Sequence, residues 1–482
     1  MHPAIIFRIL GILLMVFSIA LIPPILVSLI YQDSALNAFL SALGITFATG
    51  AVFWFPVRDR HQELRTRDGF VVTALFWMVL ALSGSLPLML ADSPGLSFTD
   101  AFFESLSGWT TTGATVITGI DGLPQSILFY RQLLQWLGGM GIIVLAVAIL
   151  PMLGIGGMQL YRTETPGPMK DNKLTPRITE TAKTLWYIYL ALTIACAIGF
   201  YFAGMNLFDA ICHAFSTVAI GGFSTHDASI GYFDSGPIEA VAIFFMIISA
   251  FNFALHFYTW RFRSIKHYFA DSEVRTLLTV LLIAGIVTFV TLVTSKSYEP
   301  NEALRFGLFE LVSIATTTGF AAADFSLWPV FLPFLLFFLA FMGGCAGSTG
   351  GGLKVIRVLL IYKQGGREMK RLIHPNAIIP IRIGGRPIDD RVVEAVWGFF
   401  SVYLILYLIM TILLLATGLD FVTAFSAVGA CINNLGPGLG DVSAHYGEIT
   451  DFAKWVLSFA MLLGRLEIFT LLVLFTPAFW RQ

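Results

Sequence analysis

Long apolar runs dominate the pattern of the chain, and ten of them are long enough to cross a membrane. A helix needs about 20 apolar residues to span a hydrocarbon core about 30 Å thick. The run near 328–362 is interrupted by glycines, and the others are continuous. The pattern predicts an all-α polytopic membrane protein with spans near residues 4–30, 36–56, 69–91, 126–150, 184–204, 236–262, 274–295, 328–362, 391–418 and 452–476.

Four shorter apolar segments lie between these runs, near residues 98–110, 206–217, 301–316 and 420–432. Segments of this length cannot cross the bilayer, so they predict re-entrant half-helices. The first run is too long for the apolar core of a signal peptide and has no convincing cleavage site, so we expect a retained helix.

Composition narrows the classes of function. Hydrophobic residues make up 57% of the 482 residues and charged residues 12%, against about 25% charged in soluble domains. A net charge of −1 does not favour nucleic acid as a partner. The four cysteines show no paired spacing and the eight histidines form no HxxxH pair, so neither a disulfide framework nor a metal centre is supported.

Basic residues gather in alternate loops and therefore predict the orientation. By the positive-inside rule these loops and both termini are cytoplasmic, while the opposite loops carry Lys296, Arg305 and several acids. The acids predict either a vestibule that concentrates cations or ordinary solubility of outer loops. The basic set is Arg58, Arg60, Arg65, Arg67, Lys170, Lys173, Arg177, Lys183, Arg261, Arg263, Lys266, Arg275, Lys363, Arg367, Lys370, Arg371, Arg382, Arg386 and Arg391. The acidic set is Asp92, Asp100, Asp121, Asp209, Asp227, Asp234, Asp324 and Asp441.

The four short segments align with one another. They read FESLSGWTTTGATV, CHAFSTVAIGGFST, FELVSIATTTGFAA and SAVGACINNLGPGL, and their shared glycines follow at intervals of 109, 97 and 117 residues. Such repetition indicates one span–half-helix–turn–span unit used four times. We expect pore units at 69–165, 166–268, 269–372 (with a broken second span) and 373–482 (with a cytoplasmic hairpin), after two helices in 1–68.

The repeat suggests how an ion could be held. A half-helix entering from outside points its negative C-terminal end at the membrane centre. Four such turns about one axis would present carbonyl oxygens that replace the water shell of a cation. No carboxylate occurs in the four turns, which favours a weakly hydrated monovalent cation over Ca²⁺. The alternative is four kinked loops that pack helices and bind no ion.

This arrangement of repeats resembles the Trk/Ktr/HKT superfamily of potassium transporters over essentially the whole chain, and the extra N-terminal helix pair resembles its TrkH type. The resemblance implies bacterial K⁺ uptake across the inner membrane, a homodimer in lipid, a cytosolic TrkA-type nucleotide-binding ring as regulator and no covalent cofactor. It implies a potassium filter in which the fourth turn departs from the threonine pattern. The filter residues would be Thr111, Thr112, Gly113, Ile220, Gly221, Gly222, Thr317, Thr318, Gly319, Asn434, Leu435 and Gly436.

The glycine-rich run FMGGCAGSTGGGLK, residues 341–354, interrupts the second span of unit 3. It lacks the G-x-x-x-x-G-K-[ST] pattern of a phosphate-binding loop. Glycines weaken a helix, so we expect a loop at membrane depth beside the pore, below the filter, where it acts as a gate. The same role follows from the resemblance. The expected gate positions are Ala346, Ser348, Thr349, Gly350, Gly351, Gly352, Lys354 and Arg465.

Arg465 is a charge inside the last apolar run, where charges are costly and usually have a partner or a role. We expect it to donate to carbonyls of the glycine-rich loop and to repel cations. The alternatives are a pair with Glu467 or snorkelling to the interface. Lys354 and Arg357 either contribute to the same gate from below or only anchor the end of the helix at the membrane interface.

Two inner segments remain. AIIPIRI and RPID flank Gly384-Gly385, which predicts a hairpin that either anchors the inner face or docks the regulator. Residues 165–183 predict an interfacial helix.

A secondary transporter coupled to H⁺ or Na⁺ is the alternative function, although ionisable groups at mid-membrane are few. A membrane enzyme would need clustered acids, histidines or a nucleophile, and the sequence shows none.

Overall fold

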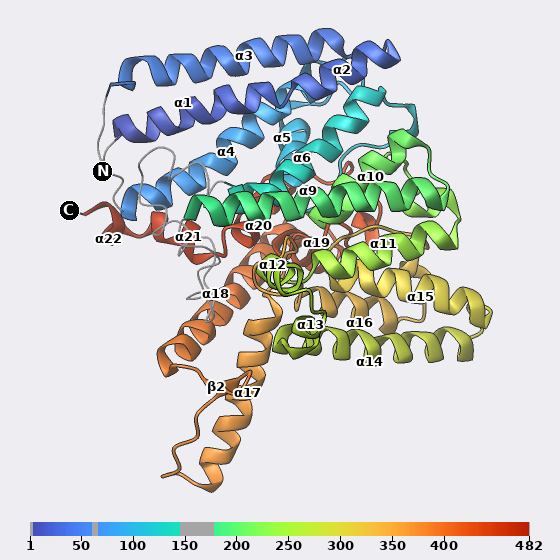
Figure 1. Cartoon of the computed structure of the whole chain (residues 1–482), viewed down its shortest axis with the longest axis vertical. Helices are drawn as coiled ribbons and strands as arrows, with labels where there is room; N and C mark the ends of the chain where they lie inside the picture. Colours follow the sequence, from blue (N-terminus) through green and yellow to red (C-terminus); the bar gives the residue numbers. More distant parts are fainter. Residues whose placement is uncertain (1–2, 60–65, 145–177, 482) are drawn as a thin grey trace.

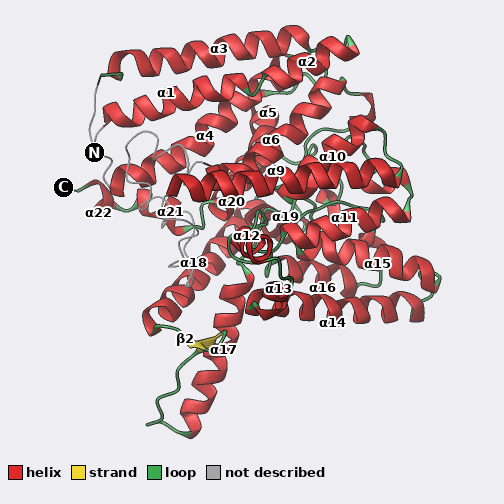
Figure 2. Cartoon of the chain, in the orientation of Figure 1, coloured by secondary structure: helices red, strands yellow, loops and turns green. Residues whose placement is uncertain are grey.

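The computed structural model describes residues 3–59, 66–144 and 178–481, and in this part of the chain all regular secondary structure is helical apart from one short hairpin (Figures 1 and 2). The all-α prediction is confirmed. The longer helices are α1 (Pro3–Ile19), α2 (Ile22–Tyr31), α3 (Leu36–Trp54), α4 (Thr66–Leu90), α6 (Gln125–Val144), α9 (Ile178–Ala203), α11 (Gly236–Ser249), α12 (Phe253–Phe262), α14 (Ser272–Thr294), α16 (Phe331–Ala340), α17 (Val355–Ile373), α18 (Asp390–Leu415) and α20 (Asp451–Arg465). The short helices are α13 (Lys266–Ala270), α21 (Phe469–Leu472) and α22 (Pro477–Trp480).

Among the described residues, six helices are long and apolar enough to cross a membrane, and two bent pairs raise the number to eight. The protein is therefore multi-pass. Two expected spans are not continuous: 236–262 bends by 95° between α11 and α12, and 452–476 bends by 110° after α20. The run at 328–362 is broken as expected, into α16 and α17, and part of the run at 126–150 lies outside the described residues.

The four short segments are all helices, and three of them begin at a side-chain cap. They are α5 (Phe98–Trp109), α10 (Leu207–Ala219), α15 (Pro300–Ala315) and α19 (Phe421–Ile432). Ser97 accepts from the backbone N–H of Asp100, and Asn206 accepts from that of Asp209. Such caps satisfy N–H groups that lack partners at a helix start. Asp100 and Asp209 return a bond to the capping residue, which accounts for two of the outer acids.

The half-helices pack against spans of their own unit and of neighbouring units. Each lies against the first span of its own unit: α4 with α5, α9 with α10, α14 with α15 and α18 with α19. The second span of one unit also packs on the next half-helix, as α6 does on α10, α11 on α15, and α20 on α5. The last contact joins the end of the chain to the first unit. The pair α1 and α3 covers α4 from outside, and both termini lie at one end of the bundle (Figure 1).

The predicted hairpin is present. Strands β1 (Arg382–Ile383) and β2 (Arg386–Pro387) pair antiparallel, with Ile383 opposite Arg386, across Gly384 and Gly385. Both glycines have positive φ, as a tight two-residue hairpin requires. The hairpin and α17 extend away from the bundle (Figure 2). Residues 165–177 of the expected interfacial helix, and the boundary between units 1 and 2, lie outside the described residues.

The contact between α1 and α3 predicts one matched pair of variants. A Cβ at Gly50 would lie 2.8 Å from the carbonyl oxygen of Gly11, whereas a Cβ at Gly44, on the same helix, meets nothing within 4 Å. Close approach of membrane helices depends on such small residues. We expect Gly50→Ile to cost about 1–3 kcal/mol and to lower the melting temperature in detergent by several degrees. Gly44→Ile should leave it unchanged, and equal melting of the two variants would contradict this packing.

Candidate functional site

The four half-helices end in the same backbone structure. The residue two before each shared glycine is left-handed, with φ of 53° at Thr111, 55° at Ile220, 65° at Thr317 and 52° at Asn434. The next N–H bonds five residues back, at 2.8–2.9 Å in every unit. This is the Schellman ending, in which glycine usually takes the left-handed position.

Three of these left-handed residues are β-branched, namely Thr111, Ile220 and Thr317. The left-handed conformation costs an L-residue roughly 1–2 kcal/mol, and such strain gathers at functional sites. At least one side chain has a use there, because Thr317 Oγ1 accepts from the N–H of Gly351 at 2.7 Å. The sequence repeat shows where the turns lie, but it gives no sign of this strain.

The four glycines close a ring. Gly113, Gly222, Gly319 and Gly436 have φ between 80° and 97°. A Cβ at Gly113 would overlap the carbonyl oxygen of Gly221 in the next unit. In the same way Gly222 meets Thr318, Gly319 meets Leu435, and Gly436 meets Thr112. Each unit therefore touches the next at the same two positions, the last touches the first, and a side chain at any glycine would break the contact.

A vestibule of about 660 Å³ opens on this ring, and all four glycines line it. Of the eight acids expected in the outer loops, Asp227 and Asp324 line the vestibule. Others are engaged elsewhere: Asp234 pairs with Arg305 at 2.8 Å and Asp100 with Lys454 at 2.6 Å. The vestibule wall therefore holds two of the eight acids expected there, with Glu310 in addition.

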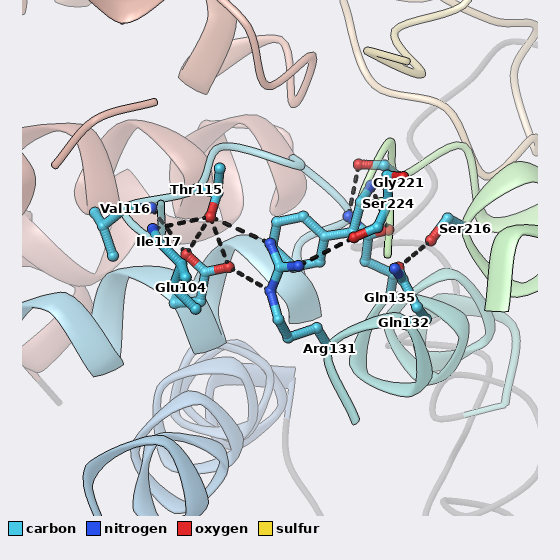
Figure 3. A network of polar contacts seen from close by, with 11 residues as sticks. Glu104, Thr115, Val116, Ile117, Arg131, Gln132, Gln135, Ser216, Gly221 and Ser224 are labelled. Carbon is cyan, nitrogen blue, oxygen red and sulfur yellow. Dashed lines mark hydrogen bonds and ion pairs between the residues drawn. The ribbon is translucent and has the colours of Figure 1, made fainter. Parts of the chain in front are cut away.

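A buried ion pair supports the first turn, and sequence reasoning missed it. Arg131 of α6 is 0% exposed, and its Nε lies 2.9 Å from Oε1 of Glu104 (Figure 3). Its other nitrogens donate to Thr115 Oγ1 and to the carbonyl of Ser224, each at 3.2 Å. Glu104 also accepts from the N–H of Val116 at 2.9 Å. The available signal was a charge inside the apolar run 126–150, where charges need partners.

Two glutamines of α6 hold the second turn. Gln135 donates to the carbonyl of Gly221 at 2.6 Å and accepts from the N–H of Phe223 at 3.0 Å (Figure 3). Gln132 accepts from Ser216 at 2.6 Å. The second span of unit 1 therefore fixes the turn of unit 2 on both sides of its glycine.

In each unit, a polar side chain nine or ten residues before the shared glycine forms a hydrogen bond with the segment that follows the turn. Glu104 does so in unit 1, and Glu310 accepts from the N–H of Ala322 at 2.7 Å in unit 3. In unit 2, His213 lies 2.9 Å from Ser224 Oγ. In unit 4, Ser426 accepts from the N–H of Leu439 at 2.8 Å. The chemistry differs between units although the geometry repeats.

The glycine-rich segment between α16 and α17 lies directly against the half-helix ends. Thr349 Oγ1 donates to the carbonyl of Val218 at 3.0 Å, and the N–H of Gly352 donates to that of Asn433 at 3.0 Å. With the bond from Gly351 to Thr317, the loop contacts the ends of α10, α15 and α19. Two further bonds fasten it: Cys345 N–H to the carbonyl of Ala250 at 2.8 Å, and Ala346 N–H to Glu273 at 2.8 Å. The first explains the bend between α11 and α12, because the loop bonds to the carbonyl exposed there.

Arg465 ends α20 instead of lying within a continuous span. Its Nη1 donates to the carbonyl of Thr349 at 3.1 Å and its Nη2 to that of Gly138 in α6 at 2.9 Å. Glu467 pairs with Arg357 at 2.6 Å, and Lys354 donates to the carbonyl of Gly350. Arg465 therefore joins the loop to unit 1, the one unit that the loop itself does not reach through the bonds above.

The remaining candidates give no reactive centre in the described part of the chain. The four cysteines are buried and unpaired with one another, and no group of three or more His, Cys, Asp or Glu side chains could hold a metal there. The ring and its loop are the candidate functional site.

His226 predicts a pH dependence, because it joins the outer loops of units 1 and 2. Its ring lies 2.5 Å from Asp121, 3.4 Å from Asp209, and stacks on Tyr232. Burial alone would lower the pKa of His226, but the bonds and charges of the two aspartates outweigh it and raise the pKa above 6.5. The charged form therefore contributes stability fully below pH 6.5 and loses it as pH rises through the raised pKa.

We expect the melting temperature of the protein in detergent to fall as pH rises from 6 to 8.5. His226→Asn should flatten this part of the profile. An identical slope in both proteins would show that the cluster does not titrate as described.

The chain is similar to proteins of one family over most of its length. Residues 35–482 match the TrkH family, described as a cation transport protein. The chain is 63% identical over 477 residues to the Trk system potassium uptake protein TrkH of Halomonas elongata, covering 99% of each. It is 54% identical over 487 residues to the protein of that name from Escherichia coli K12, covering 100% of each. The crystal structure of the potassium transporter TrkH from Vibrio parahaemolyticus matches 100% of both chains, with a TM-score of 0.91 and 55% identity. The chain belongs to the TrkH family.

Proposed function

We propose that this protein carries K⁺ across the membrane, along an axis through the ring of four glycine turns. The observation that carries the proposal is the cyclic contact of each glycine with the carbonyl of the next unit. Four independent kinked loops would have no reason to close on one another in chain order. The relatives that are named as potassium uptake proteins support the choice of ion.

The chemistry of the ring suits a weakly hydrated monovalent cation. The residues at the ring are Thr111–Gly113, Ile220–Gly222, Thr317–Gly319 and Asn434–Gly436, so main-chain carbonyls and hydroxyls are the available oxygens. Such oxygens replace water around K⁺ without a fixed negative charge. The C-terminal ends of α5, α10, α15 and α19 add partial negative charge. No covalent step is needed, and the protein acts as a transporter instead of an enzyme.

The loop at 341–354 acts as the gate of this path. Gly350 lies against the end of α15, where a Cβ would be 3.0 Å from the carbonyl of Thr316. Three half-helix ends bond to the loop, and Arg465 fastens it to the fourth side. A guanidinium below the ring also repels cations. Opening then requires Arg465 to release Thr349 or Gly138.

The setting of this pore is a proposal as well. The basic loops support an orientation in the bacterial inner membrane with both termini cytoplasmic. The relatives' name, Trk system, supports a protein that works with other components. We propose a homodimer that binds a cytosolic TrkA-type regulator through the inner face, where α17 and the β1–β2 hairpin extend from the bundle.

Flux through the purified protein tests the pore. In proteoliposomes without gradients of H⁺ or Na⁺, we expect ⁸⁶Rb⁺ uptake, and we expect Gly113→Ser to abolish it because the side chain would displace the carbonyl of Gly221. The control is Gly122→Ser, since a Cβ at Gly122 meets nothing within 4 Å. Uptake only when a H⁺ or Na⁺ gradient is imposed would favour a symporter instead.

Arg465→Ala tests the gate. Loss of its two bonds should free the loop and raise ⁸⁶Rb⁺ flux several-fold, because one bond to a charged group contributes about 1.5–3 kcal/mol. Arg465→Lys keeps the positive charge, but an ammonium group lacks the planar fork with which the guanidinium reaches the carbonyls of Thr349 and Gly138 together. This variant should therefore give an intermediate flux. Unchanged flux in both variants would remove Arg465 from the gate.

A further inference from the structure

Glu310 carries a buried carboxylate oxygen that the fold does not use. The side chain is 0% exposed and lies in the wall of the vestibule. Its Oε1 accepts from the N–H groups of Ala322 at 2.7 Å and Ala323 at 3.0 Å. Its Oε2 has no hydrogen-bond partner among the described residues. A buried carboxyl group with an unsatisfied oxygen is costly, so something outside the fold is expected to complete it.

Unit 1 shows what completes the equivalent carboxylate. Glu104 precedes Gly113 by nine residues, as Glu310 precedes Gly319. One oxygen of Glu104 holds the N–H of Val116, three residues after the glycine, as Glu310 holds Ala322. The other oxygen of Glu104 binds Nε of Arg131 at 2.9 Å. The second oxygen of Glu310 is therefore the one that a cation would bind.

Unit 3 has no basic side chain at the position that supplies this charge in unit 1. Arg131 follows Gly113 by 18 residues, and the residue 18 after Gly319 is Phe337. Unit 3 therefore has the carboxylate but an apolar ring at the position where unit 1 has the counter-charge. Pseudo-symmetry thus leaves a place for one positive charge beside the third turn.

No neighbouring side chain supplies that charge in the described structure. Two further acids lie near Glu310, namely Glu239 of α11 and Asp324 of the loop after the third turn. Burial, together with these two charges, raises the pKa of Glu310 to about 8. Arg305, on the same helix as Glu310, binds Glu239 through two bonds of 2.7 Å and Asp234 at 2.8 Å. His226 and Arg131 also line the vestibule, but both are engaged with other carboxylates. A cation in the vestibule would then supply the positive charge.

We propose that Oε2 of Glu310 is a ligand of a second cation site, in the vestibule wall, that takes a monovalent alkali ion of the K⁺ class in the place equivalent to the guanidinium of Arg131. The inference rests on the proposed transport function. The site holds an ion beside the third turn before the ion enters the ring, which raises the local cation concentration there. A proton competes for the same oxygen.

The test is the dependence of ⁸⁶Rb⁺ uptake on external Rb⁺ in proteoliposomes, for the wild type and for Glu310→Gln. At external pH 9, above the raised pKa of Glu310, the variant should need roughly threefold to tenfold more Rb⁺ for half-maximal uptake, because one local charge is lost, while its maximal rate stays within about twofold. At pH 5.5 the wild type should approach the variant, since protons then occupy the oxygen.

The matched control is Glu302→Gln, an exposed acid near the start of the same helix, which should leave half-saturation unchanged. An equal shift in Glu302→Gln would overturn the site in favour of general surface charge. Coincident curves for wild type and Glu310→Gln at both pH values would also overturn it, because Glu310 would then hold a permanent proton. If Glu310→Gln is not monodisperse, Glu310→Asp should raise half-saturation less, and an unchanged value overturns the proposal. Absence of Rb⁺ flux in the wild type would instead reject the pore.

Discussion

The architecture depends on one contact made four times, in which the Cα of a glycine packs against the carbonyl before the glycine of the next unit. Because this contact leaves no room for a Cβ, it requires glycine independently of φ. It also couples the units, since each turn supports the next and the fourth supports the first. The long-range packing of α20 on α5 serves the same closure from outside the ring.

Symmetry of the backbone is combined with asymmetry of the side chains. All four half-helices end in the same left-handed turn, yet the group that holds the outgoing strand is a carboxylate, an imidazole or a hydroxyl. The second spans differ still more. In unit 1, α6 is continuous over the described residues Gln125–Val144, with Arg131, Gln132 and Gln135 facing its neighbours, whereas in unit 3 a loop separates α16 from α17. The irregular backbone of this loop is held by hydrogen bonds with three half-helix ends and with Arg465.

Local sequence was a good guide to the half-helices and a poor one to the bends. The four short segments and the hairpin at Gly384-Gly385 were predicted within a few residues, because length and glycine position determine them. The spans 236–262 and 452–476 were predicted as continuous and are bent. Hydropathy averages over a window and cannot detect a turn that keeps its apolar character. Asn252, which caps α12 at Ala254, was the one local signal of the first bend.

The sequence by itself determined the membrane class, the four repeats, the positions of the glycine turns and the interruption of unit 3. Each of these follows from hydropathy, spacing and the backbone freedom of glycine, which are properties of neighbouring residues. Only the tertiary structure decided that the turns close on one another, that Arg131 neutralises Glu104 while Glu310 keeps an unused oxygen, and that Arg465 joins Thr349 to Gly138. Those contacts join residues up to 327 positions apart, and no local pattern encodes which distant carbonyl or carboxylate a buried charge will meet.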